Sequence, residues 1–420
     1  MKLTCVSCPL EYDADANRTR CDCGDLLDVA LNSTNSVNSE VFDRRMNSWS
    51  TPDSSGVWRY RELLPEFDQQ HIVSKPEGNT NLYDAPQIAA WAGVDQLWLK
   101  HEGENPTGSF KDRGMTVATS HAMRTGATMV ACASTGNTSA SVASYAAAAG
   151  VPSVVFVPDG KISAAKLGQT VAYGARIIQV RGDFDAAMTL VQQASQELGI
   201  YLLNSINPYR LEGQKTILFE LLHQLQWRCP DWVILPGGNL GNSSAIGKGL
   251  AELKSSGMLT KIPRMAVIQA AGASPFYEAY RSSFRGFEPM EASTVATAIQ
   301  IGNPVSYTKA RRAIELTDGV VEAVSDEEIL DAKARVDQTG IGCEPASAAT
   351  VAGLHKLVRT GVISPGDRVA GILTGHLMKD AESVMEYHLG TGSERRPLAK
   401  QPVVIDPTLE ALRSVLTHEF

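Results

Sequence analysis

The chain lacks any run of about 18 consecutive apolar residues, so we expect no helix that spans a membrane. It also lacks a positive charge balance, because its 420 residues carry a formal net charge of −8 at pH 7. A general nucleic-acid binder usually presents a basic face, so this class is disfavoured, although a local site can still attract a small anion. The start, MKLTCVSCPLEYDAD, becomes polar too early for a signal peptide, and a cytoplasmic location is expected.

Cysteine is scarce after the first thirty residues, because four of the seven cysteines are Cys5, Cys8, Cys21 and Cys23. Their spacing is C-x2-C-x12-C-x-C, and four thiolates in a reducing compartment can form a closed structural zinc site. The second pair is closer than the usual C-x2-C, so a ribbon without metal stays an alternative. We therefore predict a possible structural zinc at these four residues, with no catalytic role.

From about residue 70 onward, short β-branched segments alternate with helical segments. The runs SVVFVP at 153–158 and DWVIL at 231–235 are typical of buried parallel strands, and 184–199 is typical of a helix. This alternation predicts an α/β fold of open, mostly parallel twisted sheets with helices on both faces. The number of units exceeds what one sheet needs, so we predict two such domains with the active site between them.

The predicted organisation also includes small terminal segments. We expect a Cys-rich, ribbon-like segment at 1–35, a large domain from 36–112 and 205–390, a small α/β domain at 113–204 and a C-terminal tail at 391–420. The polar stretch LNSTNSVNSE at 31–40 is predicted to be a linker or an exposed loop.

Lys111 follows the turn-forming residues NPTGS at 105–109 and begins a helix-like segment. A partly desolvated lysine at the positive end of a helix dipole has a lowered pKa. The neutral amine is the form that condenses with an aldehyde. Taken alone, Lys111 could also be an ordinary exposed lysine in the first turn of a helix.

Two loops between a strand and a helix suit anions. The segment STGNTSAS at 134–141 offers backbone N–H groups to a carboxylate, and Asn137 could donate to a phenolate oxygen; an ordinary helix N-cap is the alternative. The segment PGGNLGN at 236–242 lets the backbone wrap a phosphate, or it is simply a tight turn.

Two further segments carry polar groups of weaker specificity. The segment 204–216 places Arg210 and Lys215 around a Pro-containing turn, which is either a clamp for a second phosphate or a solvated basic turn. The segment 372–380 places Thr374 at a strand end, where its hydroxyl could face a ring nitrogen.

Six motifs together resemble the threonine synthases, within the tryptophan-synthase-β-like (fold type II) family of pyridoxal phosphate (PLP) enzymes. They run in the family's order over about residues 75–385 and are NPTGSFKDRG at 105–114, ASTGNTSAS at 133–141, NPYRLEGQKT at 207–216, GGNLGN at 237–242, EPASAAT at 344–350 and LTGHLMKD at 373–380. The pattern departs at Leu377, where the family usually has glycine after the histidine, which leaves the shape of that loop open.

The resemblance implies a role for individual residues. Lys111 would bind PLP covalently and act on the substrate, and the other cofactor contacts would be Phe110 near the ring, Asn137 at the ring hydroxyl, Thr374 at the pyridine nitrogen, and Gly237, Gly238, Asn239, Leu240, Gly241 and Asn242 at the phosphate. The substrate carboxylate would be bound by Ser134, Thr135 and Thr138. The substrate phosphate would be bound by Asn204, Ser205 and Arg210.

The activity that the resemblance implies is the conversion of O-phospho-L-homoserine and water to L-threonine and phosphate, by a lyase of threonine biosynthesis. It also implies a homodimer acting on a small phosphorylated amino acid, with no nucleic-acid or membrane partner. A threonine or serine dehydratase, a phosphoserine-using synthase such as cysteate synthase, and a non-catalytic PLP-binding regulator remain alternatives. A dehydratase needs one phosphate site, for the cofactor, whereas a phosphohomoserine enzyme needs two.

Overall fold

The protein is described by a computed structural model. It covers residues 1–31, 39–46, 48–50, 52–160, 164–393 and 396–419. The chain forms two compact units, Met1–Asp380 and Ala381–Phe420. Most of the predicted linker at 31–40 lies outside the described residues. Within those ranges, none of the helices combines the length and the apolar character that a membrane crossing requires.

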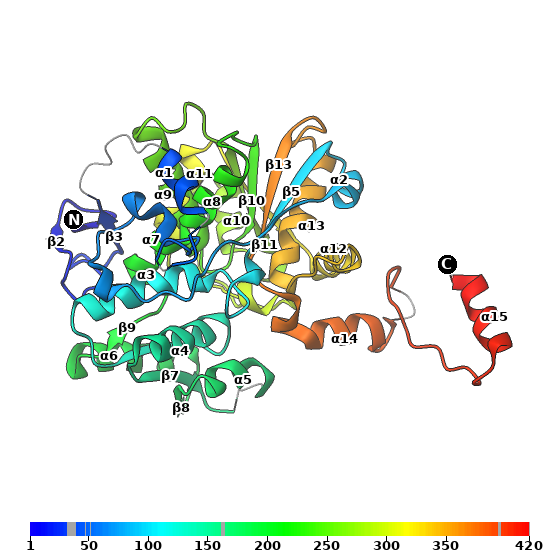
Figure 1. Cartoon of the computed structure of the whole chain (residues 1–420), viewed down its shortest axis with the longest axis horizontal. Coiled ribbons are helices and arrows are strands. Elements are labelled where there is room, and N and C mark those ends of the chain that lie inside the picture. Colours follow the sequence, from blue (N-terminus) through cyan, green and yellow to red (C-terminus); the bar gives the residue numbers. More distant parts are fainter. Residues whose placement is uncertain (32–38, 47, 51, 161–163, 394–395, 420) are drawn as a thin grey trace. The chain divides into compact units, whose positions relative to one another are not determined.

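The larger sheet of the first unit has six strands in the order β12-β11-β10-β13-β5-β4 (Figure 1). Its members are β4 (Leu82–Asp84), β5 (Gln96–His101), β10 (Trp232–Pro236), β11 (Arg264–Ala270), β12 (Val320–Val324) and β13 (Arg368–Leu373). All neighbouring pairs are parallel except β4 with β5. The central strands are buried on both faces, which is why they are largely apolar rather than alternating.

The smaller sheet has four parallel strands in the order β8-β7-β6-β9. They are β6 (Val130–Ala133), β7 (Ser153–Pro158), β8 (Arg176–Val180) and β9 (Tyr201–Leu202). The predicted α/β class with two mostly parallel sheets is therefore confirmed. The exact domain boundaries stay a prediction.

Helices connect the strands, and their bounds follow the apolar periodicity and capping of the sequence. They are α1 (Glu40–Met46), α2 (Pro86–Ala92), α3 (Lys111–Arg124), α4 (Asn137–Ala149), α5 (Ala164–Ala172), α6 (Phe184–Leu198), α7 (Pro208–Gln214), α8 (Thr216–Gln224), α9 (Gly241–Ser255), α10 (Pro275–Arg281), α11 (Tyr307–Leu316), α12 (Asp326–Gln338) and α13 (Pro345–Arg359). Short 3-10 turns lie at Trp58–Leu63, Gln69–His71, Glu102–Glu104, Ala271–Ala273, Thr297–Ile299 and Leu377–Asp380. The second unit contains α14 (Ala381–Leu389) and α15 (Leu409–Glu419).

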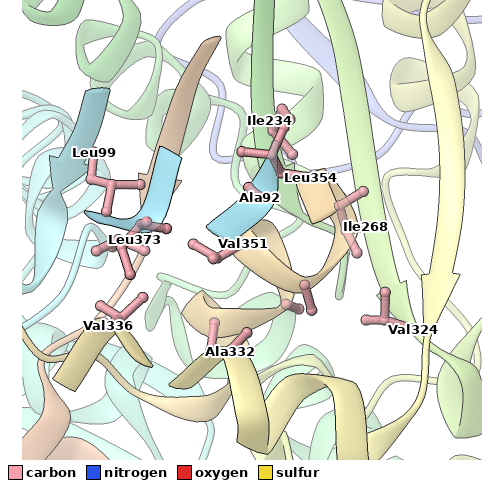
Figure 2. Packing of buried hydrophobic residues seen from close by; sticks show 14 of the residues in the cluster. Ala92, Leu99, Ile234, Ile268, Val324, Ala332, Val336, Val351, Leu354 and Leu373 are labelled. Carbon is pink, nitrogen blue, oxygen red and sulfur yellow. The ribbon is translucent and has the colours of Figure 1, made fainter. Parts of the chain in front are cut away.

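The main core lies between the six-stranded sheet and helices α2, α12 and α13. Figure 2 shows Ile234 and Ile268 of the sheet beside Val351 and Leu354 of α13. All four side chains are almost completely buried. This packing fixes α13 under the strands, and it thereby fixes the position of the residues at the start of α13.

The Cys-rich segment forms a small antiparallel sheet in the order β2-β1-β3, with β1 (Lys2–Cys5), β2 (Glu11–Asp13) and β3 (Leu27–Ala30). Leu3, Leu27 and Val29 are buried and belong to the same apolar cluster as residues of α3 and β6. The ribbon therefore packs against the body of the first unit.

Candidate functional site

The turn before Lys111 is held against the strand end that carries Thr374. Ser109 and Gly375 form an isolated antiparallel bridge. The backbone N–H of Phe110 donates to the carbonyl of Thr374 over 3.0 Å. Lys111 then begins α3, as predicted, so the two segments meet although Phe110 and Thr374 are 264 positions apart in the chain.

The Nζ of Lys111 lies 4.0 Å from the centroid of the Phe110 ring. Burial and, to a smaller extent, the positive charge of Arg210 lower the pKa of Lys111 to about 7, while Glu344 acts in the opposite direction. Part of the side chain remains accessible. Lys111 is therefore a partly exposed residue whose amine has a substantial neutral fraction near neutral pH, which suits a nucleophile.

The two residues predicted to contact the cofactor ring are bridged by the carboxyl group of Glu344. Asn137 Nδ2 donates to Glu344 Oε2 over 3.0 Å, and Thr374 Oγ1 donates to Glu344 Oε1 over 3.3 Å. Ser347 also lies 2.9 Å from the Thr374 hydroxyl. Glu344 is buried, and burial raises its pKa. Asn137, Thr374 and Lys111 therefore surround one carboxyl group.

Glu344 is the site residue that the sequence analysis missed, since its motif was noted but no role was assigned to it. A usable signal was present. Glu344 is an acidic residue directly before the helix-starting Pro345, in a segment that otherwise holds small and apolar residues. Such an acidic residue is buried only when it has hydrogen-bond partners.

The glycine loop follows β10, and its backbone packs too closely for side chains. A Cβ atom on Gly237 would lie 2.5 Å from Val267 Cγ1, and one on Gly238 would lie 3.0 Å from the Cα of Ile299. The loop then turns through Leu240 in the left-handed region, with φ of 61°, and α9 begins. The first N–H groups of α9 have no intrahelical acceptor and are suited to bind an anion.

Several side chains around this loop carry buried polar atoms that have no hydrogen-bond partner among the described residues. They include both amide atoms of Asn242 and the hydroxyls of Ser243 and Ser306. Ser306 Oγ lies 3.9 Å from the position of a Cβ on Gly241. An unsatisfied buried polar group costs about 1–3 kcal/mol, and the donors in this set, the Asn242 Nδ2 and the two hydroxyls, fit the phosphate of PLP.

Arg210 lies on α7 and is only 2% exposed. Its guanidinium donates to the carbonyl of Leu203 over 3.1 Å, while its Nε has no partner and no carboxylate of the described residues forms an ion pair with it. Burial lowers its pKa to about 10. Burying a cation without a counter-ion costs free energy, so the surroundings of Arg210 favour the binding of an anionic ligand.

The structure corrects two parts of the prediction for 204–216. The segment around Arg210 is a helix rather than a turn, because Asn207 caps α7 by accepting from Tyr209 N over 2.9 Å and Pro208 occupies the first helical position. Lys215 does not face an anion site. Its Nζ is paired with Glu212 at 2.6 Å and Glu252 at 2.7 Å.

The glycine loop and the Arg210 segment are joined by Asn239, whose Nδ2 donates to Ser205 Oγ over 2.5 Å. Asn204 is occupied differently, since its amide pairs with both the N–H and the carbonyl of Ala133, at 2.9 and 3.0 Å. Asn204 therefore fixes the end of β6. Its predicted contact with the substrate phosphate stays a prediction.

The predicted carboxylate-binding residues lie where β6 leads into α4. Ser134 Oγ accepts from the N–H of Gly136 over 3.3 Å, and Thr135 and Thr138 are partly exposed beside Asn137. The structure thus places these hydroxyls next to Asn137, which is predicted to contact the cofactor ring. Their role in substrate binding stays a prediction.

Comparison with known proteins decides the family. A model of the family described as pyridoxal-phosphate dependent enzyme matches residues 73–375. The chain is 44% identical over 414 residues to threonine synthase of Methanocaldococcus jannaschii, covering 98% of each chain. It is 45% identical over 419 residues to threonine synthase of Methanosarcina acetivorans, covering 99% of this chain and 98% of that one.

The chain belongs to the threonine synthase family of pyridoxal-phosphate dependent enzymes. A solved structure, the processed form of threonine deaminase isoform 2 from Solanum lycopersicum, superposes with a TM-score of 0.65 at 18% identity and covers 87% of this chain and 97% of that chain. This likeness shows the shared fold. The predicted family, cofactor class and fold are therefore confirmed.

At Leu377, where the sequence departs from the family pattern, the loop packs closely and Thr374 keeps defined hydrogen bonds. Leu377 packs directly against Gly342, which adopts φ of +66°. Thr374 still donates to Glu344, and its own N–H donates to Ser347 Oγ over 2.8 Å. The larger residue is accommodated on the side facing Gly342.

A buried ion network supports the start of α3 in this member of the PLP enzyme family. Arg113 Nε lies 2.6 Å from Glu102, and Arg113 Nη2 lies 2.9 Å from Glu220, which also pairs with Lys100 at 2.6 Å. These side chains are almost completely buried. The network links α3, β5 and α8 and so holds the helix that begins at Lys111.

Proposed function

We propose that this chain converts O-phospho-L-homoserine and water to L-threonine and phosphate. The observation that carries the proposal is Arg210, a buried guanidinium with no carboxylate partner among the described residues, whose charge acts on Lys111. The glycine loop at 237–242 supplies a separate anion site for the phosphate of PLP. A substrate that carries its own phosphate needs this second site.

Different residues of the chain would bind different parts of the cofactor and the substrate. The backbone and side chains of the glycine loop would hold the cofactor phosphate, and Asn137 and Thr374, held in position by Glu344, would orient the ring. Ser205 and Arg210 would hold the substrate phosphate through charge-assisted hydrogen bonds. When bound, PLP supplies a stabilising sink for negative charge that develops at the substrate α-carbon.

Lys111 is the residue that binds the cofactor and moves a proton at the substrate. With a pKa of about 7, its Nζ can both accept and return a proton near neutral pH. Its position beside Arg210 places this amine near the group that holds the substrate phosphate. Lys111 would therefore transfer the proton, and Arg210 would hold the departing phosphate, at neighbouring positions of the site.

The test compares substrates on the purified protein. We expect phosphate and threonine from O-phospho-L-homoserine, and much slower phosphate release from O-phospho-L-serine. Lys111→Ala should lose both activity and the yellow colour of bound cofactor, while Lys254→Ala, an exposed lysine of α9, should keep both. Formation of a 2-oxo acid from threonine without turnover of phosphohomoserine would instead favour a dehydratase, and a colourless, inactive wild type would favour a regulator. The cytoplasmic location and the homodimer remain predictions.

A further inference from the structure

The four N-terminal cysteines lie around one point. Their sulfur atoms all lie within 4.8 Å of one another. The closest pairs are Cys5 with Cys23 at 3.4 Å and Cys8 with Cys21 at 3.5 Å. A tetrahedral zinc ion with Zn–S bonds of about 2.3 Å requires sulfur atoms about 3.8 Å apart, whereas a disulfide requires about 2.05 Å. The arrangement therefore matches a metal site rather than two disulfides.

The backbone explains how the narrow C-x-C pair joins the site. Cys21 N donates to the carbonyl of Asp25 over 2.8 Å, and Gly24 N donates back to the carbonyl of Cys21 over 2.9 Å. Gly24 has φ of +92°, so the chain reverses immediately after Cys23. This tight turn directs both thiols of the pair toward Cys5 and Cys8.

Two hydrogen-bond donors lie close to sulfur atoms of the cluster. The N–H of Ser7 lies 3.3 Å from Cys5 Sγ, and the hydroxyl of Tyr12 lies 3.2 Å from Cys21 Sγ. Donors of this kind orient and stabilise metal-bound sulfur. We propose that Cys5, Cys8, Cys21 and Cys23 bind one structural zinc ion, each thiol losing its proton on binding.

The ribbon that carries these cysteines is anchored on α7, the helix of Arg210. The carbonyl of Ala14 accepts from Tyr209 Oη over 2.5 Å and lies 3.0 Å from His121 Nε2. Lys248 donates to the carbonyl of Val29 over 2.6 Å and also pairs with Glu212 of α7. Zinc binding would therefore stabilise the ribbon, which contacts α7 on two sides.

A second set of contacts fixes the ribbon to α11. Lys309 Nζ donates to Asp28 Oδ1 over 2.6 Å and to the carbonyl of Leu27 over 2.7 Å. Arg312 of the same helix donates to the carbonyl of Val6, directly after the first cysteine of the cluster. Loss of zinc should loosen these contacts and lower the melting temperature of the holoenzyme.

The experiment measures the metal content of the full-length holoenzyme after expression with zinc. We expect about one zinc per chain, and cobalt substitution should give the thiolate charge-transfer and strong d–d bands of a tetrahedral sulfur site. Cys23→Ser should lose the zinc and lower the melting temperature. Cys23→His, at an exposed position, should retain it, because histidine is also a zinc ligand. The matched control Cys229→Ser lies outside the cluster and should change neither quantity.

Two results would overturn the zinc site. One is a zinc-supplied wild type with no bound zinc whose melting temperature is unchanged by added zinc. The other is titration that finds the four cysteines oxidised in pairs. The stabilising role of zinc depends on the proposed function only for its kinetic consequence. Zinc loss in Cys23→Ser should raise the KM for O-phospho-L-homoserine more than it lowers kcat. Zinc stoichiometry, cobalt spectra and melting temperature are independent of catalysis, so a failed zinc site and a failed assignment of activity give different results.

Discussion

Replacing Arg210 with methionine should weaken substrate binding without destabilising the fold. Arg210 is buried and forms no ion pair with the described residues, so the folded protein bears the desolvation cost of its charge. A ligand phosphate would offset that cost. Methionine keeps much of the side-chain volume and removes the charge, and therefore separates a ligand-binding role from a structural one.

The two effects differ in size. Charge-assisted hydrogen bonds contribute about 1.5–3 kcal/mol each, so losing the phosphate contact should raise the KM for O-phospho-L-homoserine roughly 10- to 150-fold. The free energy of unfolding of the ligand-free protein should change by no more than about 1 kcal/mol, since relief of the buried charge offsets the lost bond to Leu203. Removing the guanidinium should also raise the pKa of Lys111.

The assays are steady-state kinetics with O-phospho-L-homoserine and urea denaturation without ligand. Arg113→Met is the matched control, because this buried arginine is paired with Glu102 and Glu220. Its loss should cost about 3–5 kcal/mol of stability. If Arg210→Met destabilised the protein as much as Arg113→Met and left KM unchanged, Arg210 would be structural and the argument for a second phosphate site would fail.

Three further perturbations test the surroundings of the site. In cofactor-free protein, amine labelling of Lys111, followed by peptide mass spectrometry, should rise with pH through about 7, and a midpoint near 10 would contradict the burial effect. The same lowered pKa means that the unfolded state binds more protons above pH 7, so this group's contribution to stability increases from about pH 7 toward 10.5 in denaturation curves. Glu344→Gln keeps an acceptor for Asn137 and should weaken PLP binding less than Glu344→Ala does, as measured by cofactor titration; equal affinities would show that the bridge is unimportant. Asn204→Ala removes two bonds to Ala133 and should lower the free energy of unfolding by about 1–3 kcal/mol, whereas an unchanged urea midpoint would contradict its role at the end of β6.

The fold was predictable wherever the local pattern agreed with the final environment. The run SVVFVP is β7 with the same bounds, because a β-branched segment buried on both faces has few alternatives. The segment at 207–214 was less clear, since its Gly, Pro and charged residues resemble a turn. Asn207 followed by Pro208 was the helix-start signal that was available there.

The site was predictable as separate loops but not as an arrangement. Lys111 could be identified from its turn and its position at a helix start. The bridge from Asn137 to Glu344 spans 207 positions, and it exists because the order of strands in two sheets brings α4 and α13 together. No local periodicity contains that order, so the partners of Glu344 required the tertiary structure.

The pairing of buried cations connects the fold to the choice of substrate. Lys100 and Lys215 each contact a carboxylate at 2.6 Å, so their charges are neutralised within the fold. Arg210 is as deeply buried but retains an unpartnered Nε. A substrate without a phosphate group would leave the charge of Arg210 uncompensated, whereas a phosphorylated substrate would neutralise it. The folded protein bears the desolvation cost of the Arg210 charge before any substrate binds. A substrate with a phosphate relieves this cost, and the protein therefore discriminates in favour of phosphorylated substrates.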